Sequence, residues 1–170
     1  MTLKIFNAGL LMLAAAFAAG CGVDASESDD LDADDETVGI EESALTYPAM
    51  DVPFKCGVQV IGSTWADHNP LKAIDFRLPY GSRVDASAAG TVTYVNLGTA
   101  SYGKYIVINH GNGWSTRYAH LSQATVTSGH VDRGQPIGVS GDSGKAAGAP
   151  HLHYEQIYNG SVVAIKLAGS

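Results

Sequence analysis

After residue 46 the chain consists of short runs in which apolar and polar residues alternate, separated by Gly, Asn, Asp and Pro, with no run of ten or more residues at helical spacing. Alternation with a period of two is typical of half-buried β-strands, because successive side chains point to opposite faces. The pairs Asn112-Gly113 and Asn159-Gly160 predict tight hairpins. We therefore predict a mainly β domain, a small antiparallel sheet with strands over 57–61, 73–77, 90–95, 105–109, 114–119, 136–139 and 152–158.

Residues 1–20 have the pattern of a signal peptide. Lys4 precedes an apolar run over 5–19, which is shorter than the roughly 20 residues that a membrane-spanning helix needs. Residues 18–21, Ala-Ala-Gly-Cys, resemble a bacterial lipobox, whose cysteine, here Cys21, becomes lipidated and the new N-terminus. The alternative is ordinary cleavage after Ala18, which leaves Cys21 as a thiol or as a disulfide partner of Cys56. We expect a cell-envelope lipoprotein, with a secreted protein as the second choice.

The acidic charge of the chain is concentrated between the signal peptide and the β region. Residues 24–42 contain ten Asp and Glu and no Lys or Arg. This composition cannot bury enough apolar surface to offset its ordering entropy, so we predict a disordered acidic linker over 21–45. A removed prosegment whose carboxylates occupy a metal site is the alternative. We expect residues 46–170 to form one folded domain.

Charge in this domain excludes one class of partner. Residues 46–170 hold nine Lys and Arg against seven Asp and Glu, and the cations are scattered singly along the sequence. Nucleic-acid binders usually concentrate basic residues in a stripe with interleaved aromatics. We therefore expect no nucleic-acid partner.

A His-x-His pair marks the last long predicted strand. His151 and His153 are two residues apart, so in a strand they share one face about 7 Å apart. This spacing suits one metal ligand and one base beside the metal, although the pair alone also fits a half-exposed strand. Asp75 lies in the apolar stretch 73–76, where a buried carboxylate needs a partner such as a cation. His120 supplies a further imidazole, and neutral imidazole is a common zinc ligand.

These residues belong to an ordered series of short motifs. The series, in chain order, is Asp67-His68, Ala73-Ile74-Asp75-Phe76, Pro79-Tyr80-Gly81-Ser82-Arg83-Val84, Ala88-Ala89-Gly90-Thr91-Val92, Ile108-Asn109-His110-Gly111-Asn112-Gly113, Tyr118-Ala119-His120-Leu121, Gly134-Gln135-Pro136-Ile137-Gly138, Ser140-Gly141-Asp142-Ser143-Gly144 and Pro150-His151-Leu152-His153-Tyr154-Glu155. Over residues 54–163 the chain thus resembles the lysostaphin-type, or LytM-like, zinc metallopeptidases that cut peptidoglycan peptides. The resemblance implies a small antiparallel β-sheet domain of that type with a zinc cleft.

The resemblance also implies roles for individual residues. It makes His68, Asp75 and His153 the zinc ligands, and His120 and His151 the catalytic histidines. In the compact family pattern the first ligand stands four residues before the Asp, a position that Leu71 occupies here, whereas His68 stands seven residues before Asp75. His68 is the only histidine ahead of His110, so it is the candidate.

Three further residues are expected to lie outside the metal site. His110 precedes a predicted hairpin turn, and His130 lies in a Ser-Gly-His segment that we expect to be a solvated loop. Cys56 is expected to be a small buried residue rather than a zinc ligand. The small polar loops over 69–71, 98–103 and 145–148 are expected to line a groove for an extended peptide.

The expected chemistry is amide hydrolysis with one Zn²⁺ ion. Two His and one Asp leave a fourth zinc position for water, and the sequence has no His-Glu-x-x-His motif to supply a carboxylate base. His120 or His151 must then take the proton, while the other stabilises the oxyanion or protonates the leaving amine. The resemblance implies peptidoglycan peptides as the substrate.

Two other functions fit part of the same pattern. The first is a catalytically inactive module of the same fold that binds cell wall or regulates another hydrolase, and the second is a purely structural zinc site. Five intact site residues argue against the first, and the lack of a four-ligand set argues against the second. We expect a monomer whose one membrane contact is a lipid anchor at Cys21.

Overall fold

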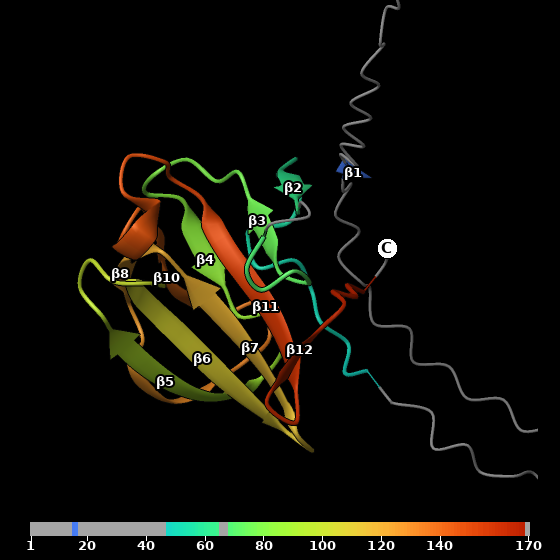
Figure 1. Cartoon of the computed structure of the whole chain (residues 1–170). Helices are drawn as coiled ribbons and strands as arrows, with labels where there is room; N and C mark the ends of the chain where they lie inside the picture. Colours follow the sequence, from blue (N-terminus) through green and yellow to red (C-terminus); the bar gives the residue numbers. More distant parts are fainter. Residues whose placement is uncertain (1–14, 17–46, 65–67, 169–170) are drawn as a thin grey trace, which may run out of the picture.

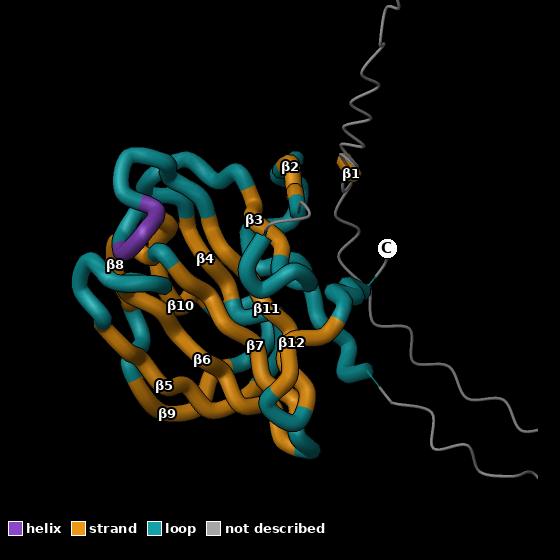
Figure 2. Tube along the Cα trace, viewed as in Figure 1, coloured by secondary structure: helices purple, strands orange, loops and turns teal. Residues whose placement is uncertain are grey.

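The computed structural model describes residues 15–16, 47–64 and 68–168. Most of the predicted signal peptide, Cys21 and the predicted acidic linker therefore lie outside the described residues. The described part is almost entirely antiparallel β-structure, and its one helix is the single 3₁₀ turn η1 (Gly144–Ala146), purple in Figure 2. The predicted fold class is confirmed. No helix in these ranges is long and apolar enough to cross a membrane.

Nine strands form one large sheet. Their order along the sheet is β1-β2-β3-β11-β7-β6-β5-β9, and β12 also pairs with β11. Figure 1 shows β11 and β7 running through the middle of this sheet. The strands are β1 (Ala15–Ala16), β2 (Ile61–Ser63), β3 (Ile74–Phe76), β5 (Gly90–Asn96), β6 (Lys104–Gly111), β7 (Trp114–Ala119), β9 (Ser128–Val131), β11 (Leu152–Tyr158) and β12 (Ser161–Val163).

A second sheet of three strands closes the core. It consists of β4 (Arg83–Asp85), β10 (Pro136–Ser140) and β8 (Leu121–Ala124), in that order. Val84, Leu121 and Ile137 from this sheet share one buried apolar cluster with Ile106, Phe76 and other residues of the large sheet. Burial of this apolar surface between the two sheets is the main favourable contribution to folding.

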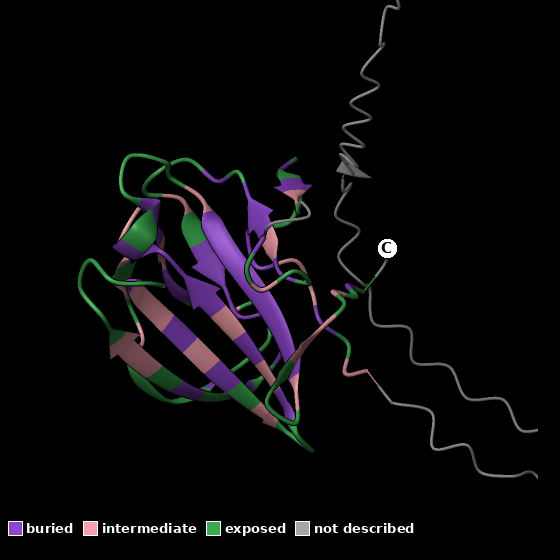
Figure 3. Cartoon of the chain, in the orientation of Figure 1, coloured by how far each residue is buried: buried purple, intermediate pink, exposed green. Residues whose placement is uncertain are grey.

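Strand β11 is buried on both faces. Its first six residues are all buried, which Figure 3 shows as a continuous purple strand. The hairpin that we predicted at Asn159-Gly160 joins it to β12, and the other predicted hairpin joins β6 to β7. Because β11 pairs with β3 on one side and β7 on the other, it brings residues from both neighbours to one place. The alternative of a half-exposed strand is wrong.

The sequence pattern located every strand of five or more residues and missed most of the shorter ones. Six of the seven predicted strands overlap β3, β5, β6, β7, β10 and β11. The seventh, over 57–61, overlaps β2 only at Ile61, because residues 57–60 form a loop. The prediction also missed β4, β8, β9 and β12, each of three or four residues. Such short segments hold too few alternating positions to show a period, and their pairing with neighbours decides their conformation.

Cys56 differs from the expectation of a small buried residue. It lies in the exposed loop over 55–59 and is disulfide-bonded. The one other cysteine in the sequence is Cys21, which lies outside the described residues. A sulfur held in a disulfide is not a zinc ligand, because the ligand is the thiolate.

Candidate metal centre

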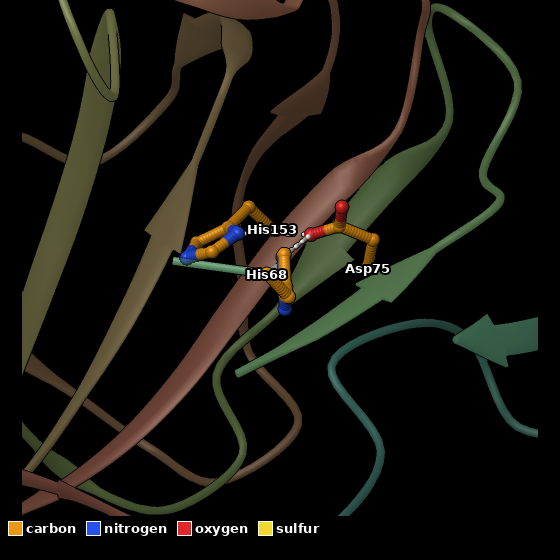
Figure 4. A group of neighbouring side chains, drawn as sticks. All are labelled: His68, Asp75 and His153. Atoms are coloured by element: carbon orange, nitrogen blue, oxygen red, sulfur yellow. Dashed lines mark hydrogen bonds and ion pairs between the residues drawn. The ribbon is translucent and has the colours of Figure 1, made fainter. Parts of the chain in front are cut away.

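Three side chains from separate segments meet where strands β3 and β11 pair. Asp75 is on β3 and His153 on β11, and the two residues are directly opposite each other in the antiparallel ladder. His68 comes from the loop between β2 and β3. Figure 4 shows the three side chains converging, with both imidazole rings facing one oxygen of the Asp75 carboxylate. All three are buried, with 4 to 8% of their surface exposed.

The distances between these side chains suit a shared metal ion. The Asp75 Oδ1 atom lies 3.1 Å from His68 Nε2 and 2.8 Å from His153 Nδ1. One ligand atom from each residue can be chosen so that all three lie within 4.8 Å of one another. Ligand atoms about 2 Å from a common zinc ion are separated by about 3 to 4 Å, so this donor set fits zinc.

Hydrogen bonds on the outer side of each imidazole orient it toward the shared centre. His68 Nδ1 lies 3.1 Å from the carbonyl oxygen of Ala73, which can only accept, so Nδ1 carries the proton and Nε2 keeps its lone pair. His153 Nε2 lies 3.1 Å from Glu155 Oε1 and donates to it, which leaves Nδ1 as the ligand atom. The two histidines thus offer different ring nitrogens to the centre.

The carboxyl group of Asp75 is held in its ionised form. Burial raises the pKa of Asp75, but the hydrogen bond from His153 and the charge of the neighbouring histidines, when these rings are protonated in the absence of a metal, outweigh it, so its pKa lies below the usual value. An ionised carboxylate with two neutral imidazoles forms a donor set with a single negative charge, which attracts a divalent cation.

His120 and His151 lie beside this group, with ring centroids 4.8 Å apart. His120 joins β7 to β8 and adopts a left-handed backbone conformation, with φ of 61°. Such a conformation is costly for a side chain other than glycine and is often found at functional sites. His151 precedes β11, forms an isolated bridge with Gly141 and places Nε2 3.6 Å from Asp75 Oδ2.

Both of these imidazoles are anchored through Nδ1. His120 Nδ1 donates to the carbonyl oxygen of Ser143 at 2.8 Å, and His151 Nδ1 donates to that of Ala149 at 2.7 Å. Each Nε2 atom therefore keeps a lone pair and accepts a proton. Burial lowers the pKa of His120 to about 4, despite the opposing hydrogen bond to Ser143, so this ring is neutral at neutral pH.

Two glycines bring the Ser143 carbonyl to His120. Gly103 and Gly144 both have positive φ, and their backbones pack against each other so closely that a Cβ atom on either would overlap the other segment. This contact holds the loop after β5 against the turn that carries Ser143. Any side chain at these positions would force the two segments apart and move the acceptor of the His120 ring.

Two open pockets meet at the centre. A pocket of about 300 Å³ is lined by His68, Asn69, Asp75, Ser101, Tyr102, His120, Lys145, His151 and His153. A second, of about 610 Å³, is lined by Ser63, Asp75, Arg77, Leu78, Pro79, Tyr80, Ala149, Pro150 and His151. Asp75 and His151 line both, so the pockets form one cleft with the candidate metal centre at its middle. The first pocket includes residues from each of the three loops that we expected to line a groove.

The structure keeps the other two described histidines away from this cleft. His110, on β6, donates from Nδ1 to the Ala89 carbonyl oxygen, and its Nε2 lies 2.9 Å from Thr116 Oγ1. His130 is exposed, as predicted, but it lies on β9 rather than in a loop. Neither lines either pocket of the cleft.

A hydrogen-bonded network that the sequence pattern did not predict lies behind His153. Glu155 is fully buried and accepts hydrogen bonds from Tyr102 Oη at 2.7 Å and from Arg117 Nη1 at 2.7 Å, in addition to that from His153. Burial raises the pKa of Glu155, but these three donors outweigh it and hold it below its usual value. Burial and the bond to Glu155 raise the pKa of Tyr102 to about 12. A carboxylate two residues after the second His was the one available sequence signal.

Comparisons with known proteins give a consistent family. The family model for peptidase family M23 matches residues 69–165. The DD-carboxypeptidase/endopeptidase Mpg of Neisseria meningitidis is 38% identical over 128 residues, which is 75% of this chain and 29% of that protein. The peptidoglycan DD-endopeptidase ShyA of Vibrio cholerae is 45% identical over 95 residues, 55% of this chain and 22% of that protein. The chain thus spans less than a third of the length of these curated relatives.

Solved structures agree with the family model. A zinc-containing peptidase from Vibrio cholerae superposes with a TM-score of 0.58 and 28% identity, covering 71% of this chain and 41% of that one. The antimicrobial peptidase lysostaphin from Staphylococcus simulans gives a TM-score of 0.50 and 28% identity over 55% of this chain and 41% of that one. The matched family region contains Asp75, His120, His151 and His153, and it begins one residue after His68. The chain belongs to peptidase family M23.

Proposed function

We propose that this protein is a zinc-dependent endopeptidase that hydrolyses amide bonds in bacterial peptidoglycan peptides. The observation that carries the proposal is the arrangement of His68, Asp75 and His153 around one point. The unprotonated Nε2 atoms of two further histidines, His120 and His151, lie in the same open cleft and can accept a proton. The names of its relatives support peptidoglycan as the substrate class. All of these residues come from one chain, which supports an active monomer.

The three ligands would hold a single zinc ion. When bound there, zinc would supply Lewis acidity at the scissile carbonyl and lower the pKa of a water molecule from 15.7 to about 7. The protein must then move the proton of that water. His120 and His151 each hold Nδ1 on a backbone carbonyl, so Nε2 is the atom that takes or returns a proton. The histidine that accepts this proton at Nε2 can then return it to the leaving amine nitrogen, so the proton taken from water is the proton given to the amine.

The catalytically inactive alternative makes a different prediction from the same fold. A cell-wall-binding or hydrolase-regulating module has no need of a proton acceptor held in a left-handed backbone conformation beside a complete ligand set. The decisive experiment measures the metal content of the purified protein and then its lysis of cell walls in a gel, with and without a chelator. Zinc at one equivalent with chelator-sensitive lysis supports the enzyme. Zinc binding without lysis supports the inactive module.

We further propose that the protein acts outside the cytoplasm as a secreted enzyme. Residues 1–20 have the pattern of an export signal, and the disulfide at Cys56 favours an oxidising compartment. A disulfide between Cys56 and Cys21 and a lipid on Cys21 exclude each other, because both use the same sulfur atom. The disulfide therefore favours ordinary cleavage over the lipid anchor.

Mass spectrometry of the mature protein distinguishes these two forms. We expect an N-terminus at Ala19, no lipid on Cys21, and a mass that rises by two hydrogens when the disulfide is reduced. A Cys56→Ser variant should show no such increase, which makes it the matched control. A mature protein that begins at a lipid-modified Cys21 and fractionates with membranes would contradict the proposal and restore the lipoprotein.

A further inference from the structure

The cleft carries an unpaired cation on each side of His151. Arg77 lines the larger pocket and Lys145 lines the smaller one, and both residues are exposed. Within the described part of the chain, Arg83, Arg117 and Arg133 each pair with a carboxylate, whereas Arg77 and Lys145 take part in no ion pair. The cleft thus presents two cations whose charge is not neutralised by a neighbouring residue.

No second acidic residue of the described cleft wall offsets the charges of Arg77 and Lys145. Among the described residues that line the two pockets, Asp75 is the one acidic residue, and it belongs to the candidate metal centre. With Asp75 used as a ligand, the other described residues of the cleft wall are positive or neutral. A peptide that lies along this cleft meets a cation before and after its scissile bond, which favours substrates that carry carboxylates.

We propose that Arg77 and Lys145 form two carboxylate-binding subsites, one on each side of the scissile amide. This inference rests on the proposed function and narrows its substrate class to anionic peptides. Arg77 offers a planar fork of donors that matches a carboxylate, while Lys145 acts as a flexible point charge. Cross-linked stem peptides with free carboxylates fit these subsites, and a neutral glycine bridge does not use them.

The test compares one cross-linked peptide in four forms. The first has free carboxylates on both sides of the scissile bond, the second and third have the carboxylates of one side or of the other side amidated, and the fourth has both sides amidated. We expect kcat/KM of the parent enzyme to fall about tenfold for each side that is amidated, mainly through KM. Arg77→Gln should lose about tenfold on the free-acid peptide and become insensitive to amidation on one side only. Lys145→Gln should show the same pattern for the other side.

The control and the contrary outcomes separate this inference from the proposed function. Arg133→Gln, at an exposed arginine outside the cleft, should leave all four rates unchanged. Equal rates of the parent on all four peptides would overturn the subsites while the endopeptidase stands. If the parent cleaves none of the peptides, the proposed function fails. Binding of the four peptides to the zinc-loaded protein then decides the subsites, and equal affinities would overturn them.

A second inference comes from the buried carboxylate behind His153. Glu155 is wholly buried, and its Oε1 atom faces the Nε2 atom of His153 while Arg117 balances its charge at Oε2. Because Nε2 must be protonated to donate, this contact fixes the tautomer that offers Nδ1 to a metal. We propose that Glu155 is a positioning residue that sets the zinc affinity of the site. Its burial and three donors leave it no access to substrate.

Paired variants in an Arg117→Leu background test this role without leaving a buried charge unpaired. Arg117→Leu/Glu155→Gln keeps an oxygen that accepts from His153, and Arg117→Leu/Glu155→Leu removes it. We expect zinc to bind the Leu variant 10 to 100 times more weakly than the Gln variant, measured by chelator competition. Equal affinities would overturn the proposal. If the Leu variant does not fold, the NMR signal of the His153 Nε2 proton in the zinc-loaded Gln variant decides, and its absence overturns the proposal.

Discussion

Replacing His153 with alanine is expected to remove zinc and activity together. Its Nδ1 atom is one of the three ligand atoms gathered at the candidate metal centre, the one such group among the described residues. A site reduced to one imidazole and one carboxylate should bind zinc more than about 100-fold more weakly, which exceeds the cost of losing an outer hydrogen-bond partner. Activity on cell walls should fall to background at micromolar zinc.

His130→Ala is the matched control for this variant. His130 is exposed on β9 and lies outside the cleft, so the control should keep one equivalent of zinc and full activity. Metal analysis after gel filtration, combined with chelator competition, measures the outcome. A His153→Ala protein that keeps zinc at full stoichiometry and parental affinity would refute the ligand assignment.

Replacing His120 with alanine should lower activity without removing zinc. The His120 ring is anchored to the Ser143 carbonyl oxygen and does not belong to the group of three ligand atoms, so zinc should stay bound. Loss of a positioned proton acceptor typically lowers the rate by about 10² to 10⁴-fold. We expect kcat to fall within this range while zinc affinity stays within a few fold of the parent.

The double measurement on His120→Ala distinguishes a base from a ligand. Zinc content and kcat are measured on the same preparation, with the thermal unfolding midpoint as a check that the domain is intact. If the variant loses its metal, His120 is a ligand and the assigned roles must be exchanged. If kcat is unchanged, His151 alone carries the proton transfer.

The clearest success of the sequence pattern is in β11. A period of two predicted that His151 and His153 face the same side, and both line the same pocket. Asp75 stood out as a carboxylate inside an apolar strand, and it lies opposite His153 in the ladder. These predictions succeed because side-chain direction in an extended strand is a local property of the backbone.

His68 was predicted as a ligand from the family resemblance and not from a local sequence pattern. Its position seven residues before Asp75 gave no local reason to expect it at the centre. The loop between β2 and β3 folds back so that His68 Nδ1 reaches the Ala73 carbonyl oxygen and Nε2 reaches Asp75. Loop conformation of this kind depends on the contacts that close the loop and not on residue spacing alone.

The sequence by itself determined the β class, the long strands and the residue types that converge at the candidate metal centre. Alternation and hairpin signals are encoded within a few neighbouring residues, so they are readable without the fold. Only the tertiary structure decided the short strands, the anchoring of His120 by Ser143, the burial of Glu155 with Arg117 and the unpaired cations of the cleft. Each of these depends on which distant segment covers a given side chain, and that is set by the packing of β7, β11 and the two sheets rather than by local sequence.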